Sequence, residues 1–244
     1  PEPFSEKTSF KDSEVIRPPA SKRDPLRDAL PELRGQVVLE GSSGLGKTQF
    51  IKYLLRNSKR LAVFLPAERC RQGVLEAIQA KLEGHAKDSA FLQSIIFSGA
   101  LDIYIDGLNE VTADTRARIV QFVESNFHGN ILLATQPMQW TRPASARLYV
   151  LQPLSDAHVS KFLASREPLL GEDARLRGQK YLTQCERFVH EVFSPEQPEA
   201  LRLAMGEVLS NPLDLTVIAQ MLAEGHSPNL FRLREQQYEL MART

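Results

Sequence analysis

The amino-acid sequence predicts an α/β fold, in which helices flank a parallel sheet and a small all-helical domain follows. Three observations lead to this prediction. Four short apolar runs are each bounded by turn or helix signals, and such runs are typical of strands that helices cover on both faces. Helical patterns lie between the runs, and strand alternating with helix favours a parallel sheet. After about residue 153 only helical patterns remain.

The composition is that of a globular chain. Its 244 residues, of which 42% are apolar and 25% charged, allow one large domain or two small ones with a substantial core. Lys plus Arg and Asp plus Glu both number 30. This balance offers no electrostatic case for a nucleic-acid groove over the whole chain, although a local patch stays open.

The cysteine content favours a reducing compartment, so we expect a cytoplasmic protein. Cys70 and Cys185 are far apart in the sequence, which fits neither a disulfide framework nor a zinc site. Arg69 and Arg71 flank Cys70 and could lower its pKa, but no catalytic partner pattern accompanies it, which favours an ordinary thiol. No apolar run approaches the roughly 18 residues of a membrane span. The chain starts with proline and stops in mid-pattern, so we expect a piece of a longer protein.

The first part of the chain is expected to be a linker or arm. Residues 1 to about 24 are polar and carry four prolines, a composition typical of extended segments. Asp24-Pro25 can start a short helix that places Leu26, Ala29 and Leu30 on one side and ends before Gly35.

The elements of the α/β part follow from apolar spacing. The expected strands are residues 37–39, 61–65, 101–105 and 131–134, with a fifth candidate at 148–151. The helices between them are indicated by three sets of apolar residues at helical spacing: Phe50, Ile51, Leu54 and Leu55; Val74, Leu75, Ile78 and Leu82; Ile119, Val120 and Val123.

The last third reads as helices only. Ser155 is a plausible N-cap for a helix that carries Val159, Phe162 and Leu163. Further helices are expected over residues 181–193 and 200–209, and another starting at Pro212, because proline is tolerated in a first turn. A final helix would carry Leu230, Leu233, Tyr238 and Met241.

Residues 41–48 read G-S-S-G-L-G-K-T and fit the phosphate-binding pattern G-x-x-x-x-G-K-[ST]. Glycines let the backbone curl so that successive N–H groups converge, and the helix that follows adds its positive end. Lys47 would reach the β- and γ-phosphates, and the Thr48 hydroxyl would bind Mg²⁺. The sequence therefore predicts a P-loop NTPase domain whose nucleotide is held by Gly41, Ser42, Ser43, Gly44, Leu45, Gly46, Lys47, Thr48 and Gln49.

The second half of such a site is a strand that ends in an acid. Residues 101–111 read L-D-I-Y-I-D-G-L-N-E-V, and Asp106 would lie at the carboxyl edge of the sheet, where it could hold Mg²⁺ through water. Asp102 is a weaker candidate at the far edge. Glu110 could polarise the attacking water, or it could be a solvated turn acid. An Asn-Lys-x-Asp string is absent, which favours adenine over guanine.

These elements predict three regions. Residues 1–34 form the arm with its short helix, residues 35–152 the P-loop nucleotide-binding domain, and residues 153–244 the helical domain. The predicted catalytic residues are Lys47, Asp106 and Glu110, and the predicted metal ligands are Thr48 and Asp106.

Four strings together resemble the NACHT branch of the STAND signal-transduction ATPases: G-S-S-G-L-G-K-T, I-D-G-L-N-E-V, L-L-A-T-Q-P and L-S-N-P-L-D-L. The resemblance covers roughly residues 35–244 and implies ATP/ADP and Mg²⁺ as ligands. It also implies effector and sensor domains beyond this piece, signalling of the innate-immunity kind and self-assembly on activation. It further implies that residues 41–48 cradle phosphates, that Asp106 holds the metal and that Glu110 is the catalytic acid. Pro212 would pack on adenine, although a plain helix start explains it equally well.

Two positions depart from the family pattern. Asn109 stands where the family usually has aspartate, and Gln136 stands where it usually has arginine within a Thr/Ser-Arg-Pro string. Asn109 cannot act as a base, and Gln136 can donate hydrogen bonds but brings no positive charge to phosphoryl transfer. Both departures favour slow hydrolysis with nucleotide binding intact.

Other candidate residues have weaker cases. His85, His128, His158, His190 and His226 are dispersed without ligand spacing, which favours surface or capping roles over metal binding. Trp140 and Arg142 follow Gln136-Pro137 in a loop expected near the γ-phosphate. Arg142 could replace the missing arginine, or it could be a solvated loop residue.

Three function classes remain open on the sequence alone. The first is an ATP/ADP switch of the NACHT type, without clear nucleic-acid or membrane partners, that self-assembles when ATP replaces ADP. The second is a motor or loader ATPase of the AAA+ kind that acts on nucleic acid or protein. The third is a scaffold that binds nucleotide without turnover.

Overall fold

The structure is a computed structural model that describes residues 26–82, 88–125, 128–230, 232, 233 and 235. The chain divides into two compact units between Pro31 and Glu32, and each is considered by itself. The described part of the first unit contains the short helix α1 (Leu26–Ala29), as expected. The expected arm over residues 1–24, His85 and the later part of the expected final helix, with Tyr238 and Met241, lie outside the described residues.

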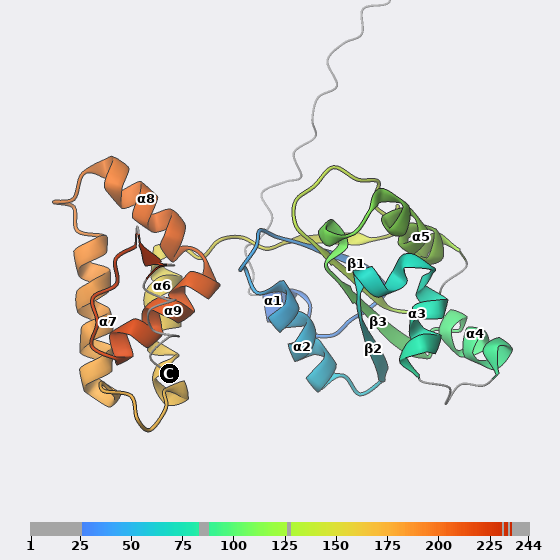
Figure 1. Ribbon diagram of the computed structural model, residues 1–244, viewed down its shortest axis with the longest axis horizontal. Coiled ribbons are helices and arrows are strands. Elements are labelled where there is room, and N and C mark those ends of the chain that lie inside the picture. Colours follow the sequence, from blue (N-terminus) through green and yellow to red (C-terminus); the bar gives the residue numbers. More distant parts are fainter. Residues whose placement is uncertain (1–25, 83–87, 126–127, 231, 234, 236–244) are drawn as a thin grey trace, which may run out of the picture. The chain divides into compact units, whose positions relative to one another are not determined.

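The second unit contains the predicted parallel sheet (Figure 1). All pairs between neighbouring strands are parallel, and the strand order is β2-β3-β4-β1-β5. The five expected strands are confirmed to within two residues: β1 Gln36–Glu40, β2 Leu61–Pro66, β3 Leu101–Asp106, β4 Ile131–Thr135 and β5 Arg147–Val150.

Alternation along the strands divides the sheet into two apolar faces. Val38 on β1, Ile103 and Ile105 on β3 and Leu133 on β4 join one hydrophobic cluster. Their sequence neighbours on these strands, such as Leu132, are equally buried but lie outside that cluster. Because successive strand side chains point to opposite faces, each face needs its own cover of helices.

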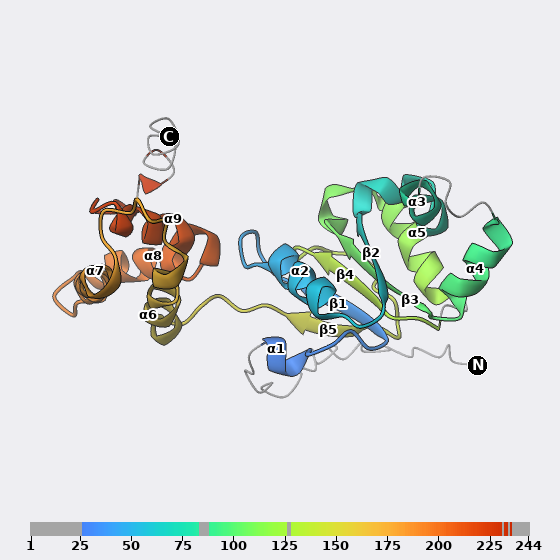
Figure 2. The same ribbon diagram turned by 90° about the horizontal axis from the view of Figure 1, so that it is seen from below.

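Helices cover both faces, as the views in Figures 1 and 2 show. The cluster on the first face includes residues of the 3₁₀ segment η1 (Ala67–Arg71) and of the helices α3 (Val74–Lys81), α4 (Ser89–Phe97) and α5 (Ala113–Glu124). On the opposite face lies α2 (Lys47–Asn57), which buries Phe50, Ile51 and Leu54. The predicted α/β fold with a parallel sheet between helices is therefore confirmed.

The sequence patterns did not predict α4. It begins after Asp88, whose carboxylate accepts hydrogen bonds from the Ala90 and Phe91 N–H groups at 2.9 and 3.0 Å. Leu92 and Ile96 lie one turn apart and are buried. The N-cap acid and this spacing are start and periodicity signals, but they are short and easily missed.

A second hydrophobic cluster belongs to the helices that follow the sheet. These helices confirm the expected pattern: α6 Asp156–Ala164, α7 Gly178–Val192, α8 Glu199–Leu209 and α9 Pro212–Ala223. The last of them, α9, contacts the other three. It is buried on most sides, through Leu215, Ile218, Met221, Leu222 and others, as expected for a central helix.

Ser155 occupies the N-cap position of α6, as predicted, but its side chain does not cap the backbone. Its hydroxyl instead lies 2.7 Å from Nδ1 of His158. The imidazole therefore competes with the backbone N–H groups for the hydroxyl.

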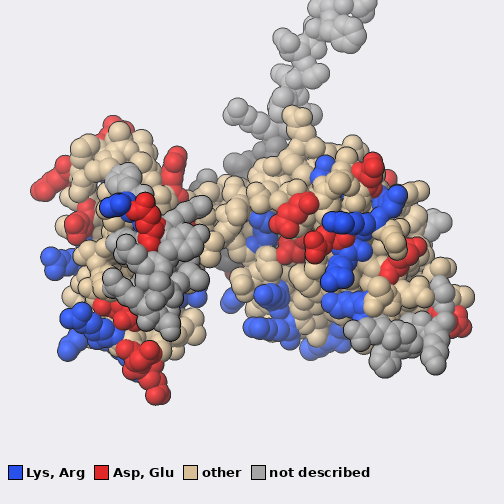
Figure 3. Space-filling view, in the orientation of Figure 1, with Lys and Arg blue, Asp and Glu red and all other residues tan. Residues whose placement is uncertain are grey.

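The surface carries both signs of charge. On the face shown in Figure 3, basic and acidic side chains both lie over the described residues, in line with the zero formal net charge of the whole chain. Within the part of the chain that the structure describes, no helix is long and apolar enough to cross a membrane.

Candidate functional site

The candidate site lies at the carboxyl edge of the sheet, where the parallel strands end together. The glycine-rich loop, residues 41–46, follows β1 and leads into α2. Strand β4 pairs with β1 on one side and with β3 on the other. The register therefore brings Gln136, just after β4, between the glycine-rich loop and Asp106 at the end of β3.

Lys47 folds back over the loop that precedes it. Its Nζ donates to the carbonyl oxygens of Gly41 and Ser42 at 2.7 and 2.9 Å. Partial burial lowers the pKa of Lys47, while the charges of Asp106 and Glu110 oppose that shift. The ammonium therefore lies close to both predicted acids, in a setting where an arriving anion would gain from its charge.

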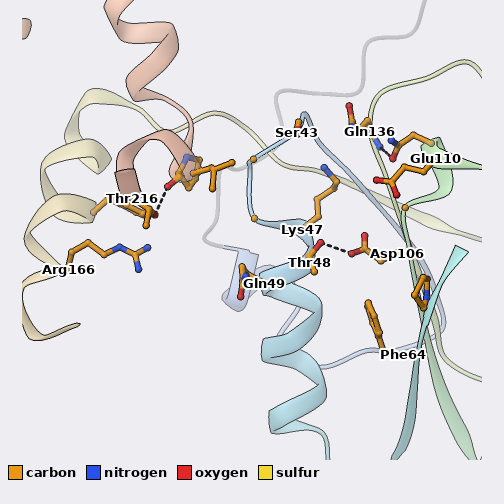
Figure 4. A pocket seen from close by; sticks show the side chains of 18 residues that line it. Ser43, Lys47, Thr48, Gln49, Phe64, Asp106, Glu110, Gln136, Arg166 and Thr216 are labelled. Atoms are coloured by element: carbon orange, nitrogen blue, oxygen red, sulfur yellow. Dashed lines mark hydrogen bonds between the residues drawn. The ribbon is translucent and has the colours of Figure 1, made fainter. Parts of the chain in front are cut away.

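Thr48 and Asp106 are in direct contact. The Thr48 hydroxyl donates to the Asp106 carboxylate, with Oγ1 and Oδ2 2.5 Å apart (Figure 4). The first turn of α2 and the end of β3 thus place a hydroxyl oxygen and a carboxylate side by side. Hard oxygen donors of this kind suit Mg²⁺, so the two residues predicted as metal ligands fit that ion.

Glu110 ends a tight turn that starts at Gly107. Gly107 has φ +84°, and a Cβ added there would lie 3.0 Å from Oε2 of Glu110. The 3₁₀ segment η2 (Leu108–Glu110) follows, and Arg116 on α5 donates to the carbonyl oxygens of Leu108 and Val111. Glycine is favoured at 107 because of this left-handed backbone, and the Glu110 carboxylate lies close beside it.

The two departures from the family pattern contact each other. The side-chain Oδ1 of Asn109 accepts a hydrogen bond from the backbone N–H of Gln136 at 3.1 Å. The bond links the Glu110 turn to the end of β4. Asn109 therefore serves here as a neutral acceptor that joins two loops, a role that needs no charge.

These residues line one cavity of about 940 Å³, within the usual range for small-molecule sites. Most predicted binding residues line it: Ser43, Gly44, Gly46, Lys47, Thr48, Gln49, Asp106, Glu110, Gln136 and Pro212. The exceptions are Gly41, Ser42 and Leu45. Two of these, Gly41 and Ser42, contribute through the carbonyl oxygens that hold Lys47.

Sequence reasoning missed several lining residues. Phe64 and Pro66 come from the end of β2, and the rule that parallel strands end at one edge could have indicated them. The others, Phe162, Arg166, Leu213 and Thr216, come from the helical segment. No sequence pattern indicated Phe162 or Arg166, because their place depends on how that segment folds back.

The start of α9 contacts the glycine-rich loop. The side-chain Nδ2 of Asn211 donates to the Ser43 carbonyl at 3.1 Å, and its Oδ1 caps α9 by accepting from the Leu213 N–H at 2.9 Å. Gly44, with φ +80°, lies against this amide so closely that a Cβ would be 2.4 Å from Oδ1. Pro212 begins α9, as predicted, and lines the cavity.

Asp102 lies at the opposite, amino edge of the sheet, as expected. Its buried carboxylate accepts hydrogen bonds from Nε of Arg60 at 2.8 Å and from Nδ2 of Asn130 at 2.9 Å. Oδ1 of Asn130 in turn accepts from the Gly35 N–H at 2.7 Å. Asp102 therefore joins the starts of four strands and has a structural role.

Both cysteines are buried thiols. Burial raises the pKa of the Cys70 thiol to about 12, and it also raises the pKa of Cys185. The possibility that the neighbouring arginines lower the pKa of Cys70 is therefore wrong, because desolvation outweighs them. Among the described residues, no group of three or more His, Cys, Asp and Glu side chains is placed to hold a metal.

Trp140 and Arg142 do not line the cavity around Lys47. Trp140 packs against the cluster on the first face of the sheet and lines a groove beside α5, and Arg142 is exposed. Arg142 is therefore not placed to supply the charge that Gln136 lacks.

A parallel sheet with a glycine-rich loop between β1 and α2 and an acid at the end of β3 defines an α/β fold of the P-loop NTPase type. No protein-family model matches the chain, and no curated protein matches it in sequence. Among similar solved structures is a chain described as Drosophila ORC bound to DNA, with 17% sequence identity and a TM-score of 0.46. The match covers 88% of this chain and 65% of that chain, so this chain spans less than two thirds of its neighbour.

Proposed function

We propose that this chain is the nucleotide-binding part of an ATP/ADP switch of the NACHT type, with slow Mg²⁺-dependent hydrolysis. The observation that carries the proposal is the contact between Thr48 and Asp106 beside Lys47. It joins the two halves of the proposed phosphate and metal site, which lie 58 residues apart in sequence.

Each residue has a role in this proposal. The backbone of residues 41–48 and the Lys47 ammonium bind the phosphates, because converging N–H groups and a positive charge favour anions. Thr48 and Asp106 would hold Mg²⁺, which neutralises phosphate charge when it is bound. Glu110 accepts a hydrogen bond from the attacking water and orients it.

Slow hydrolysis follows from what surrounds Glu110. Gln136, at the end of β4, brings no positive charge to the cavity, and Asn109 is neutral and bonded to the Gln136 backbone. Phosphoryl transfer depends on cations that stabilise the charge of the transition state, and such a cation is worth about 10³–10⁵ in rate. The site therefore suits prolonged nucleotide occupancy better than rapid turnover.

A switch also needs contacts that differ between its nucleotide states. Asn211 and Pro212 supply a candidate. Asn211 binds the glycine-rich loop, and the two residues are the N-cap and the first residue of α9, the central helix of the second cluster. We propose that ADP holds one arrangement and that ATP favours self-assembly, in the cytoplasm and as part of a longer protein with effector and sensor domains.

The test is to identify the nucleotide on protein purified without added ligand. Native mass spectrometry should find ADP, and Lys47→Ala should lose it, because Lys47 supplies the charge that the phosphates need. Lys52→Ala is the matched control, since Lys52 is exposed on the same helix. Lys47→Ala protein that keeps its nucleotide would place the site elsewhere.

Other outcomes separate the alternatives. An empty site with sustained ATP turnover would favour a motor or loader ATPase over the switch. Retained ATP that is not hydrolysed over hours would favour a scaffold that uses nucleotide for stability.

A further inference from the structure

Arg166 is the charged cavity residue that has no role in the proposed function. It follows α6 and lines the cavity together with Lys47, and its side chain points into that space in Figure 4. Among the described lining residues, Lys47 and Arg166 are the two basic side chains. A highly charged anion in this cavity would therefore have one cation on the glycine-rich loop and one on the helical segment.

The Arg166 guanidinium stacks on an aromatic ring. Its Cζ lies 4.2 Å from the centre of the Phe162 ring, and Phe162 is one turn earlier, on α6. A guanidinium stacked on an aromatic ring keeps its N–H groups in the plane, where they remain free to donate at its edge. The arrangement leaves the planar donor fork available for a ligand with paired oxygen atoms.

Arg166 is half-buried and forms no ion pair within the described part of the chain. Its Nε is buried and has no hydrogen-bond partner there. Buried donors are nearly always paired in folded proteins, because an unpaired one carries a desolvation cost. A half-buried guanidinium that lines the cavity and forms no ion pair among the described residues is available to an acceptor that arrives with the ligand.

The two acids of the cavity do not meet this need. Asp106 is bonded to Thr48, and the carboxylate of Glu110 lies against Gly107. Both come from the strand side of the site and have roles toward metal and water in the proposal above. A phosphate group offers the paired, charged oxygens that an arginine fork binds best.

We infer that Arg166 is a second phosphate-binding residue, through which the helical segment binds the phosphate chain of the nucleotide. This inference rests on the proposed function, because it assumes that nucleotide occupies the cavity. It gives Arg166 a role in phosphate binding, not the role of the transition-state cation that Gln136 on β4 cannot supply.

The test compares affinities for ATP, ADP and AMP by displacement of a fluorescent nucleotide from the 244-residue chain. Arg166→Ala should weaken ATP and ADP binding about 10- to 100-fold, the size of a lost charge-assisted hydrogen bond, and should change AMP binding much less. Arg166→Lys should show an intermediate loss, because lysine keeps the charge but not the fork. Arg177→Ala, at an exposed arginine of the same segment, should bind like the wild type.

Unchanged ATP and ADP affinities in Arg166→Ala, or an equal loss for all three nucleotides, would overturn the inference. Thermal unfolding without nucleotide checks that the variants fold, and Arg166→Gln replaces Arg166→Ala if the smaller side chain destabilises the segment.

Lys47→Ala in the same assay separates this inference from the proposed function. Suppose that the wild type binds nucleotide, that Lys47→Ala does not, and that Arg166→Ala binds like the wild type. This result would exclude the role of Arg166 and leave the proposed function standing. If the wild type binds none of the three, both proposals fail.

Discussion

The hydroxyl of Thr48 and the carboxylate of Asp106 form a 2.5 Å hydrogen bond between the start of α2 and the end of β3. The same strand carries a second acid, Asp102, four residues earlier at the other edge of the sheet. Asp102 is bonded to Arg60 and Asn130 instead. Strand β3 thus carries one carboxylate that lies in the candidate site and a second carboxylate with a structural role at the amino edge of the sheet.

This contrast gives opposite expectations for the two acids. Asp106→Ala should raise the Mg²⁺ concentration needed for ATP binding at least about tenfold, because one of two hard oxygen donors is lost, and should leave stability nearly unchanged. Asp102→Ala should lower the free energy of unfolding by about 1–3 kcal/mol, because it removes the buried, charged acceptor of the hydrogen bonds from Arg60 and Asn130. Mg²⁺ titrations of nucleotide binding and denaturant unfolding measure the two effects. If Asp106→Ala binds Mg²⁺ and ATP normally, Asp106 does not hold the metal.

Removal of the charge at Glu110 should separate binding from hydrolysis. Glu110→Gln keeps the size of the side chain but replaces the carboxylate by a neutral amide, which cannot take up a proton. We expect unchanged nucleotide affinity and a loss of about 10²-fold or more in the ATP hydrolysis rate. Glu124→Gln, at an exposed acid on α5, is the control. Fast steady-state turnover in the wild type that Glu110→Gln abolishes would contradict a slow switch.

The two hydrogen bonds of Asn211 can be tested separately. Asn211→Ser keeps an N-cap for α9, whereas Asn211→Ala removes it and should cost about 1 kcal/mol in stability. Neither side chain reaches the Ser43 carbonyl as the amide does. Both variants should therefore weaken nucleotide binding to a similar degree, while only Asn211→Ala should unfold at lower temperature. Wild-type affinity in both variants would show that the Asn211–Ser43 bond does not support the loop.

The buried thiol of Cys70 predicts a pH effect with a definite sign. Its pKa is raised from an ordinary 9.0 to about 12, so between these values the folded chain keeps a proton that the unfolded chain loses. The stabilising contribution is fully present below about pH 9 and is lost as pH rises toward 12, by about 1.4 kcal/mol per pH unit.

The measurement compares wild type with Cys70→Ala by denaturant unfolding at several pH values. The difference in unfolding free energy should be constant up to about pH 8.5 and should shrink above it. Iodoacetamide should also label Cys70 slowly in the folded chain at pH 8 and rapidly after unfolding. Rapid labelling of the native protein would contradict a buried, protonated thiol.

The strands were predictable because each is a short apolar run bounded by turns, a local signal that needs no knowledge of the partners. The same holds for α2 and α9, whose starts at Lys47 and Pro212 depend on nearby residues. The helix α4 was not predicted, because a single capping acid and two buried residues make a weak pattern.

By itself, the sequence determined the α/β class, the glycine-rich loop and the identity of its lysine, threonine and acids, because these depend on local spacing and strand ends. Only the tertiary structure decided which residues from the helical segment line the cavity. Arg166 and Phe162 lie more than 110 residues after Lys47, and their place depends on chain folding that no periodicity encodes. The tertiary structure likewise decided that Asn109 bonds the Gln136 backbone and that burial, rather than two neighbouring arginines, sets the pKa of Cys70.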